Sequence, residues 1–412
     1  MTSLEIIEKK VFETFCNTVS YKSFMQSVEM ADLLKKRGYQ VTYLGLKDEE
    51  ALQVAAVLFS LPMTGGLHME INSGPVSRDK HYLKQFYQGL QSYAKENGAL
   101  ELLVKPYNTY QHFDSTGQPT DQENTTLLDD FLSLGYQHDG LLTGYPGGEP
   151  DWHYVKDLTD LDEKTLLKSF SKKGRPLVKK AKTFGITLRK LNRDELPLFK
   201  EITSATSDRR DYDDKSLDYY QDFYDSFGDS CEFMVASLNF QDYLAHLETD
   251  KAKLDQQIEK LRTAIENNNV SEKKQNQLRE LSSQSATFDT RMAEAKEFIG
   301  KYGSQNVVLA GSLFVYTKQE AVYLFSGSYP EFNKFYAPAL LQEYVMLEAI
   351  KRGITTYNLL GITGEFDGSD GVLRFKQNYN GYITRKMGTF RYYPHPLKYK
   401  LIHNLKKILR RH

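Results

Sequence analysis

Two segments of the chain carry many cationic side chains and no acidic ones. Lys164–Arg193 and Gly371–His412 each hold 11 Lys and Arg residues without any Asp or Glu. The whole chain has 53 basic and 54 acidic residues, so the remainder keeps 31 basic against 54 acidic ones, a net charge of −23. Positive segments on an acidic body indicate an anionic partner, such as nucleic acid, a phosphorylated substrate or a membrane surface. The alternative is a pair of solvated helix faces that lack acids.

The sequence lacks the common motifs of nucleophilic, metal-dependent and phosphate-binding enzymes. It contains neither a Gly-x-Ser-x-Gly elbow nor a Gly-x-x-x-x-Gly-Lys-Ser/Thr loop, and its nine histidines are scattered. Asp367–Gly371 lacks the spaced ligands of a calcium loop, which favours a turn. No Arg/Gln-x-x-Gly-x-Gly/Ala pyrophosphate loop is present, which argues against coenzyme A as acyl donor. We therefore expect neither a metal nor a cofactor.

The composition is that of a globular protein with a buried core. A length of 412 residues predicts two to three domains, and 40% hydrophobic with 26% charged residues excludes general disorder. The longest apolar run, near Val54–Met63, is about ten residues, too short to span a bilayer. Met1–Cys16 does not resemble a secretory signal, and two cysteines fit the reducing cytosol. A cytoplasmic location is expected.

Residues 1–150 have the patterns of mixed α/β structure. Val41–Leu46 and Val54–Leu61 are predicted strands, and His81–Asn97 is a predicted helix that ends at a glycine. Tyr110–Asn124, rich in Gln, Thr, Asp and Gly, is predicted to be a loop.

The pattern changes to long helices within Phe240–Tyr302. Apolar residues recur there at spacings of three and four in two series separated by the polar Asn267–Ser271. This predicts an antiparallel coiled-coil hairpin, because each arm can bury the apolar stripe of the other. A β-hairpin is predicted next, with strands Val307–Tyr316 and Ala321–Phe325. The coiled coil is therefore expected to be an insertion within one α/β domain.

Leu397–Arg411 is predicted to be a basic amphipathic helix. Its apolar residues lie on one face and its lysines and arginines fill the other. Such a helix either packs its apolar face on the protein or lies on anionic lipid, and both can hold if the cationic side stays free.

Several tracts together resemble the Fem family of peptidoglycan-branching aminoacyltransferases, which use aminoacyl-tRNA. The tracts are Tyr323–Ser328 (YLFSGS), Tyr357–Gly364 (YNLLGITG), Gly371–Tyr379 (GVLRFKQNY), Ser23–Ser27 (SFMQS) and Gly74–Val76 (GPV). The resemblance covers essentially the whole chain.

Two further tracts, Leu61–Pro75 and Tyr145–His153, are most similar to the streptococcal MurN type, which adds alanine as the second residue of the cross-bridge. The resemblance thus implies transfer of alanine from alanyl-tRNA to the lysine-branch amine of a lipid-linked peptidoglycan precursor. An aminoacyl ester is already activated, so the enzyme mainly orients an amine and stabilises an oxyanion.

The resemblance implies an α/β (α+β) fold with two GNAT-like acyltransferase domains and the inserted coiled coil. Residues 1–150 would form the acceptor-side domain, on which a C-terminal helix, 396–412, packs back. Residues 151–240 and 303–395 would form the second domain, and 241–302 the coiled-coil arm.

The resemblance also implies the site residues. Lys376 matches the lysine of the family's Phe-Lys pair and is expected to stabilise negative charge in the transition state or at the tRNA ribose. Arg209 or Arg210 would bind the acceptor's pyrophosphate, for which a guanidinium is well suited. The family's lysine in an N-terminal helix falls at Leu34 or Lys35. The substrate-binding set is Arg209, Arg210, Lys35, Tyr323, Gly327, Ser328 and Phe375.

The chain departs from the family where relatives carry an Asp-Pro dipeptide after a strand. Lys105-Pro106 occupies that place, so a carboxylate that could assist the acceptor amine is absent there. No general base is therefore assigned.

The first basic segment is the predicted contact with tRNA phosphates. Its candidates are Lys172, Lys173, Arg175, Lys179 and Lys180. Such contacts are independent of sequence and sensitive to salt. The coiled coil contacts tRNA or a synthetase, or is a purely structural or docking arm.

Two other functions stay open. One is a Fem-type transferase that adds serine or glycine, or acts at the first bridge position. The other is a non-catalytic RNA- or membrane-binding adaptor on the same fold, against which the retained Phe-Lys pair and Gly-Ser loop argue.

Overall fold

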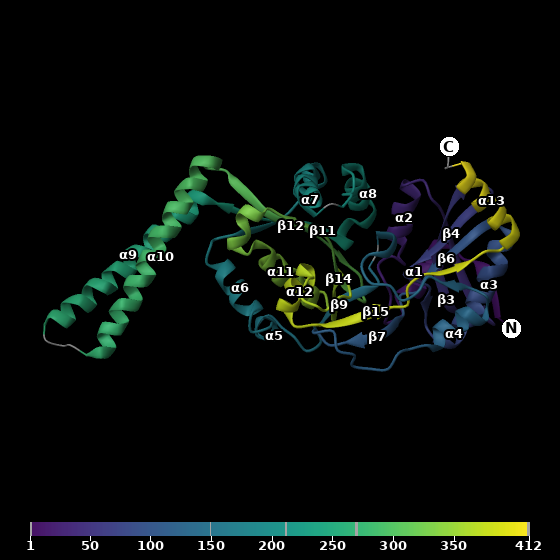
Figure 1. Ribbon diagram of the computed structural model, residues 1–412, viewed down its shortest axis with the longest axis horizontal. Coiled ribbons are helices and arrows are strands. Elements are labelled where there is room, and N and C mark those ends of the chain that lie inside the picture. The colour runs from purple at the N-terminus through teal and green to yellow at the C-terminus, as the bar shows by residue number, and fades with distance from the viewer. Residues whose placement is uncertain (1, 149, 211, 268–270, 410–412) are drawn as a thin grey trace.

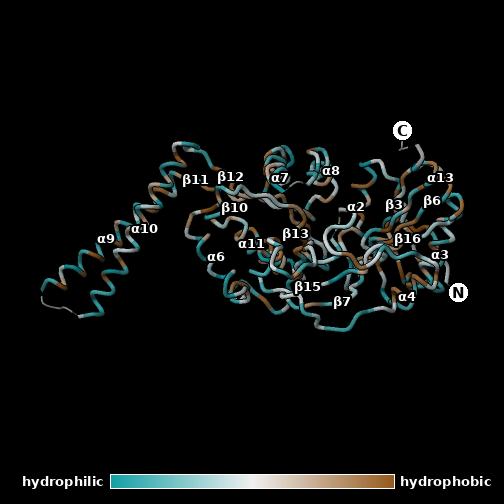
Figure 2. Tube along the Cα trace, viewed as in Figure 1, coloured by the Kyte–Doolittle hydropathy of each residue, from teal (hydrophilic) through white to brown (hydrophobic). Residues whose placement is uncertain are grey.

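The computed structural model describes residues 2–148, 150–210, 212–267 and 271–409 of the chain. Two sheets follow one another along the long axis of the molecule, and a pair of long helices projects from one end (Figure 1). Figure 2 shows hydrophobic residues gathered within the two sheets, whereas hydrophilic residues dominate the projecting helices. The predicted α/β architecture with an inserted helical hairpin is confirmed.

Among the described residues, the first sheet has eight strands, mostly from the N-terminal part of the chain. In spatial order they are β1 (Thr2–Ile6), β2 (Gln40–Asp48), β3 (Ala51–Met63), β4 (Gly66–Asn72), β6 (Ala99–Lys105), β16 (Phe390–Tyr392) and β8 (Gln137–His138), with β5 (Val76–Ser77) beside β3. β4 and β6 run parallel, whereas β3 pairs antiparallel with β4 and β16 with β6. The two strands predicted within residues 41–61 are confirmed as β2 and β3.

The second sheet also has eight strands. In spatial order they are β10 (Thr187–Lys190), β11 (Cys231–Asn239), β12 (Asn306–Tyr316), β13 (Ala321–Ser328), β14 (Thr356–Ile362), β9 (Trp152–Asp157), β15 (Tyr382–Lys386) and β7 (Thr109–Phe113). The predicted hairpin after the coiled coil is confirmed as β12 and β13. β13 and β14 are a parallel pair at the centre of the sheet.

Each sheet contains a strand from the other half of the chain. β7 forms the edge of the second sheet beside β15, and β16 lies between β6 and β8 of the first. The expected boundaries at residues 150 and 395 therefore do not separate the two sheets. The prediction that Tyr110–Asn124 is entirely a loop is wrong, because Thr109–Phe113 pairs with a strand 270 residues further along, which local patterns do not reveal.

Helices cover both sheets. They are α1 (Lys9–Cys16), α2 (Val28–Lys36), α3 (Leu83–Glu96), α4 (Thr126–Ser133), α5 (Leu166–Ser169), α6 (Gly174–Lys182), α7 (Leu196–Arg210), α8 (Leu217–Phe227), α11 (Ala337–Lys351) and α12 (Gly371–Lys376). α3 and α4 pack on the first sheet, while α6 and α11 share one core of the second sheet and α7 and α8 share another. Met30 and Leu33 of α2 pack in the same cluster as Phe223 of α8, so the two halves share apolar contacts.

The projecting arm consists of α9 (Phe240–Glu266) and α10 (Glu272–Tyr302), which confirms the predicted coiled-coil helices. Leu254 and Ile258 are buried between them, as the heptad pattern requires. Aromatic side chains anchor the base of the arm, where the rings of Phe240 and Phe298 stack at 4.5 Å. Residues 268–270 of the predicted turn lie outside the described residues.

The C-terminal helix, α13 (Pro396–Leu409), lies against β6 of the first sheet. Ile402 packs on Gly65, whereas Leu397, Leu401 and Leu405 are exposed. The predicted basic residues Arg410 and Arg411 lie outside the described residues. Within the described part of the chain, no helix combines the length and apolarity needed to cross a membrane.

Candidate functional site

The second sheet opens between the C-terminal ends of β13 and β14. The two strands pair only at Ala321 with Tyr357 and at Val322 with Asn358, and then diverge. Leu360 has φ +56°, a left-handed conformation that leucine rarely adopts, next to a bulge in the pairing of β14 with β9. Diverging strands leave main-chain groups that a ligand can meet.

Lys376, the last residue of α12, reaches this opening. Its Nζ donates to the carbonyl oxygen of Gly361 at 2.5 Å, and the residue is 3% exposed. Asp370 caps α12 by accepting two backbone N–H groups of the first helical turn at 2.7 and 3.1 Å. The same carboxylate accepts the N–H and hydroxyl of Thr363, both at 3.0 Å, and so ties the end of β14 to the helix that positions Lys376.

The surroundings of Lys376 change its titration. Burial lowers the pKa of Lys376 to about 7, the charge of Asp370 opposes this change, and the positive charge of Arg210 adds to it. An ammonium group in such a site is poorly solvated, so it interacts strongly with an anionic oxygen that enters the opening. The expected role of Lys376 in stabilising negative charge fits this geometry.

The structure distinguishes the two candidate arginines at the end of α7. Arg209 donates to the carbonyl oxygen of Ser328 at 3.0 Å and so holds the end of β13. Arg210 is exposed, and its positive charge adds to the burial that lowers the pKa of Lys376. The same charge opposes the burial that raises the pKa values of Tyr323 and Tyr145. Of the two arginines, Arg210 is thus the one whose charge acts on Lys376.

The end of β13 packs tightly on α7. A Cβ at Gly327 would lie 2.5 Å from the carbonyl oxygen of Ile202, so a glycine is required for this approach. The N–H of Ser328 donates to the hydroxyl of Thr206 at 3.1 Å. Tyr323 is half-buried on the same strand, and burial raises its pKa.

The Phe375 side chain packs within the protein. Its ring packs edge-on against Tyr379 at 5.5 Å and joins the core of the second sheet. Phe375 therefore holds α12 in position, and its predicted contact with substrate stays a prediction.

Two aromatic residues, one before β9 and one at its first position, lie near the end of β14. The hydroxyl of Tyr145 lies 3.4 Å from the carbonyl oxygen of Gly361, which Lys376 also contacts. Trp152 lies against Gly364, where a Cβ would be 2.4 Å from the indole nitrogen. The sequence tract Tyr145–His153 contains both residues, but nothing in its spacing indicates that it folds over the β14 end.

A buried polar network lies behind the opening and connects the two sheets. The hydroxyl of Tyr107 donates to Glu320 at 2.6 Å, and the side-chain amide of Asn358 contacts Tyr107, Glu320 and His153 at 3.0 to 3.2 Å. Burial raises the pKa of Glu320, whereas burial and the charges of Lys386 and Lys376 lower that of His153. Asn358, from the Tyr-Asn-Leu-Leu-Gly tract, is therefore a positioning residue between the halves.

Two N-terminal lysines lie apart from the opening. Lys35 is exposed on α2 with its Nζ 5.5 Å from the ring centroid of Tyr43, and no contact among the described residues joins it to Lys376 or Arg210. Lys105, at the position of the missing carboxylate, pairs with Glu70 at 3.1 Å.

The first basic segment forms a surface beside the opening. Lys172, Lys173, Lys179 and Lys180 are exposed on or next to α6, whereas Arg175 donates to the carbonyl oxygens of Lys168 and Phe170 and stabilises the turn before the helix. The start of α6 touches the segment that follows Lys376. The N–H of Ser171 donates to the carbonyl oxygen of Asn378 at 3.0 Å, and a Cβ at Gly174 would lie 2.0 Å from that oxygen. The start of the helix that carries the exposed lysines is thus held against the segment that follows Lys376.

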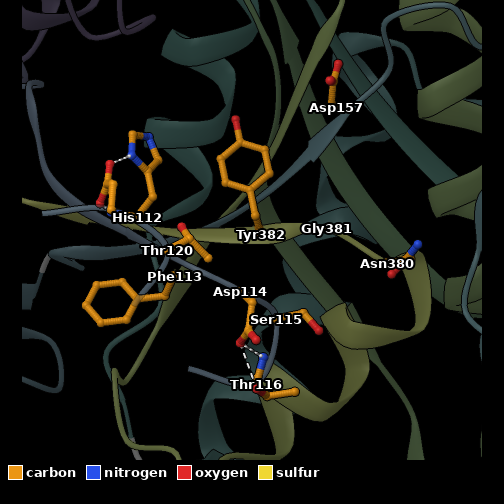
Figure 3. A pocket seen from close by; sticks show the side chains of 11 residues that line it. His112, Phe113, Asp114, Ser115, Thr116, Thr120, Asp157, Asn380, Gly381 and Tyr382 are labelled. Carbon is orange, nitrogen blue, oxygen red and sulfur yellow. Dashed lines mark hydrogen bonds and ion pairs between the residues drawn. The ribbon is translucent and has the colours of Figure 1, made fainter. Parts of the chain in front are cut away.

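A wide pocket of about 680 Å³ lies on the edge of the second sheet, between β7 and β15 (Figure 3). None of the predicted site residues lines it. Its acids are engaged locally, because Asp121 pairs with His112 and Asp114 accepts hydrogen bonds from Thr116 and Gln118. The side chains gathered in the pocket offer no catalytic group near Lys376, so the opening between β13 and β14 is the better candidate.

Two mixed sheets in tandem, each with a central parallel strand pair, form a fold of two GNAT-like domains. A model of the FemAB family matches residues 7–407. The chain belongs to the FemAB family, and it is an aminoacyltransferase by class.

Two relatives and two solved structures are each similar to the chain over more than nine tenths of its length. The aminoacyltransferase FemA of Staphylococcus epidermidis is 27% identical over 408 residues, which cover 97% of this chain and 98% of the relative. FemA of Staphylococcus aureus is 27% identical over 390 residues, covering 92% and 93%. A crystal structure of FemX superposes with a TM-score of 0.77 at 22% identity over 97% of this chain and 99% of that one. A tandem GNAT protein from the clavulanic acid pathway has a TM-score of 0.49 over 96% of this chain.

Removing the two arginines is expected to have different effects. Arg210→Ala should raise the KM for an anionic substrate roughly 10- to 100-fold, because a charged hydrogen bond to phosphate is lost. The substitution should also raise the pKa of Lys376, since the charge of Arg210 lowers it. The loss of activity on the basic side of the pH–rate profile should therefore move to higher pH. Steady-state kinetics across pH would measure both. Arg209→Ala, which releases the end of β13, should leave that side of the profile in place; equal shifts in both variants would contradict the assignment.

Proposed function

We propose that the protein transfers alanine from alanyl-tRNA to the lysine-branch amine of a lipid-linked peptidoglycan precursor, as the second residue of the cross-bridge. The family match over residues 7–407 supports aminoacyl transfer as the activity. The choice of alanine and of the second position is supported by the resemblance of Leu61–Pro75 and Tyr145–His153 to the MurN type.

The reaction suits the geometry around Lys376. The neutral amine attacks the ester carbonyl, a C–N bond forms and the C–O bond to the tRNA ribose breaks. The leaving ribose oxygen takes up the proton that the amine loses and becomes a hydroxyl. The ammonium of Lys376 would stabilise the oxyanion, and Arg210 would bind phosphate at the same opening. Lys172, Lys173, Lys179 and Lys180 would contact the tRNA backbone. The protein would act in the cytoplasm, with a peripheral contact at the inner face of the membrane through residues 397–411.

The deciding experiment offers each donor with each acceptor. The protein is incubated with alanyl-, seryl- or glycyl-tRNA and with lipid-linked precursors that carry no bridge residue or one. We expect the fastest transfer from alanyl-tRNA to the precursor that already carries one residue. Absence of transfer from every donor would overturn the enzymatic proposal, whereas equal transfer to the unbranched precursor would overturn the second position.

A Fem-type transferase of serine, glycine or the first bridge residue is the second candidate. Lys105, where relatives have a carboxylate, indicates an acceptor side that differs from theirs and so favours an acceptor that already carries a residue. A non-catalytic adaptor is disfavoured, because Lys376 is buried and held by a capped helix, which an RNA-binding surface does not need.

A further inference from the structure

The apolar stripe of α13 faces solvent instead of the protein core. Leu397, Leu401 and Leu405 are 82%, 62% and 49% exposed. Their spacing of four residues places them on one face of the helix, one turn above another. Isolated exposed leucines are ordinary on protein surfaces, but a continuous row along a helix marks an interaction site.

The orientation of this row is fixed by contacts on the other side of the helix. Ile402 packs on Gly65 of the first sheet, where a Cβ would lie 2.1 Å from the isoleucine Cδ1, so a side chain at position 65 would displace α13. The ring of Tyr399 packs on that of Tyr393 at 4.0 Å. The leucines therefore point outward because the opposite face is already occupied.

Cations border the leucine row on both sides. At 100° per residue, Lys398 follows one edge of the row, and Lys400 and Lys407 follow the other. All are exposed, and the chain has no acidic residue from 371 to its end. An apolar row between lysines is the arrangement of a helix that lies in the interface of an anionic bilayer, where leucines enter the acyl boundary and lysines extend to phosphates.

We propose that α13 is a membrane-docking helix that holds the first sheet against an anionic lipid surface. This deepens the proposed function, which requires a lipid-linked acceptor, and it places the acceptor-side half of the molecule at the bilayer. α6, with its exposed lysines, lies in the other half of the molecule (Figure 1) and stays accessible to tRNA. A second copy of the chain is a poor occupant, because a symmetric contact would bring the lysines of both helices together without acids.

Vesicle binding tests the proposal with the full-length protein. Vesicles of phosphatidylcholine alone are compared with vesicles that contain about one third phosphatidylglycerol, a composition chosen to supply negative surface charge. We expect binding to the anionic vesicles and at least about tenfold weaker binding to the neutral ones. Leu397→Ser/Leu401→Ser/Leu405→Ser should reduce anionic binding at least about tenfold, and Lys400→Glu/Lys407→Glu should do so in a salt-dependent way. The matched control is Val11→Ser/Leu132→Ser, which removes exposed apolar side chains from α1 and α4.

Several results would overturn the proposal. They are absence of wild-type binding to anionic vesicles, equal binding to neutral vesicles, or undiminished binding by the triple-serine variant. A concentration-dependent dimer in sedimentation velocity that the serine substitutions abolish would assign the row to self-association instead. Because the leucines are exposed, the far-ultraviolet circular dichroism of the variants should match the wild type.

A second measurement separates this proposal from the proposed reaction. The triple-serine variant should keep wild-type turnover on a water-soluble acceptor peptide and lose it on an acceptor embedded in anionic vesicles. If the wild-type protein turns over neither acceptor, the proposed reaction is contradicted, and the vesicle-binding experiment alone then tests the role of α13. Equal turnover of variant and wild type on the vesicle acceptor would overturn the role of α13.

Discussion

Lys376→Met is expected to lower kcat roughly 100- to 1000-fold, the loss typical of removing one group that stabilises a transition-state oxyanion. The Kd for aminoacyl-tRNA should change much less, because the ammonium would act on charge that develops only during transfer. Single-turnover transfer and equilibrium tRNA binding would measure the two quantities. Lys156→Met is the matched control, since Lys156 is also 3% exposed and burial lowers its pKa to about 8, but it contacts Asn380 away from Gly361. Unchanged turnover in the Lys376 variant would remove this residue from the mechanism.

The same substitution should make the protein more stable, which excludes misfolding as the cause of lost activity. The pKa of Lys376 is about 7 in the folded protein against 10.5 for an ordinary lysine. Between these values the unfolded chain binds more protons, so the lysine's unfavourable contribution shrinks as pH rises. The gain from methionine should therefore be largest below about pH 7 and fall towards pH 10. Urea unfolding at pH 6.5 and at pH 9 would test this; a gain independent of pH would contradict burial of the charged form.

Lys179→Glu/Lys180→Glu is expected to weaken tRNA binding roughly 10- to 100-fold at low salt and to flatten the dependence of log Kd on log salt by about two units. Both side chains are exposed on α6, and the segment before that helix contacts Asn378, two residues after Lys376. The variant loses two phosphate contacts and introduces repulsion, so the effect should be the same for every tRNA sequence.

The control for tRNA binding is Lys10→Glu/Lys95→Glu. It makes the same change in net charge with exposed lysines on α1 and α3 in the other half of the molecule. Filter binding over a range of salt concentrations would measure both variants. An unchanged slope of log Kd against log salt for the α6 variant, or an equal change in the control, would indicate that these lysines form an ordinary solvated helix face.

Local sequence patterns predicted the helices and strands whose apolar residues recur at a regular spacing. The heptad spacing identified α9 and α10, and the paired apolar runs identified β12 with β13. The strand exchange of β7 and β16 escaped prediction, because short strands pair with partners far away in the sequence and carry little periodicity of their own.

The sequence predicted several residues of the candidate site, but it did not predict the contacts that these residues make. Lys376 came from a sequence tract, but its burial against Gly361 depends on the diverging strands and on the cap at Asp370. Sequence reasoning could not separate Arg209 from Arg210, since only the fold shows that Arg209 holds Ser328 while the charge of Arg210 acts on Lys376. Tyr145 and Trp152 were missed because their contacts with Gly361 and Gly364 form only when β14, from far along the chain, lies beside them.

The exchange of strands has a consequence for how the protein is made. β16 lies inside the first sheet, between β6 and β8, yet its Phe390 pairs with Val104 from much earlier in the chain. On the ribosome the edge of β6 stays uncovered until residues 390–392 have been synthesised. Neither half can finish folding alone, so the two acyltransferase units mature together as a single unit of synthesis.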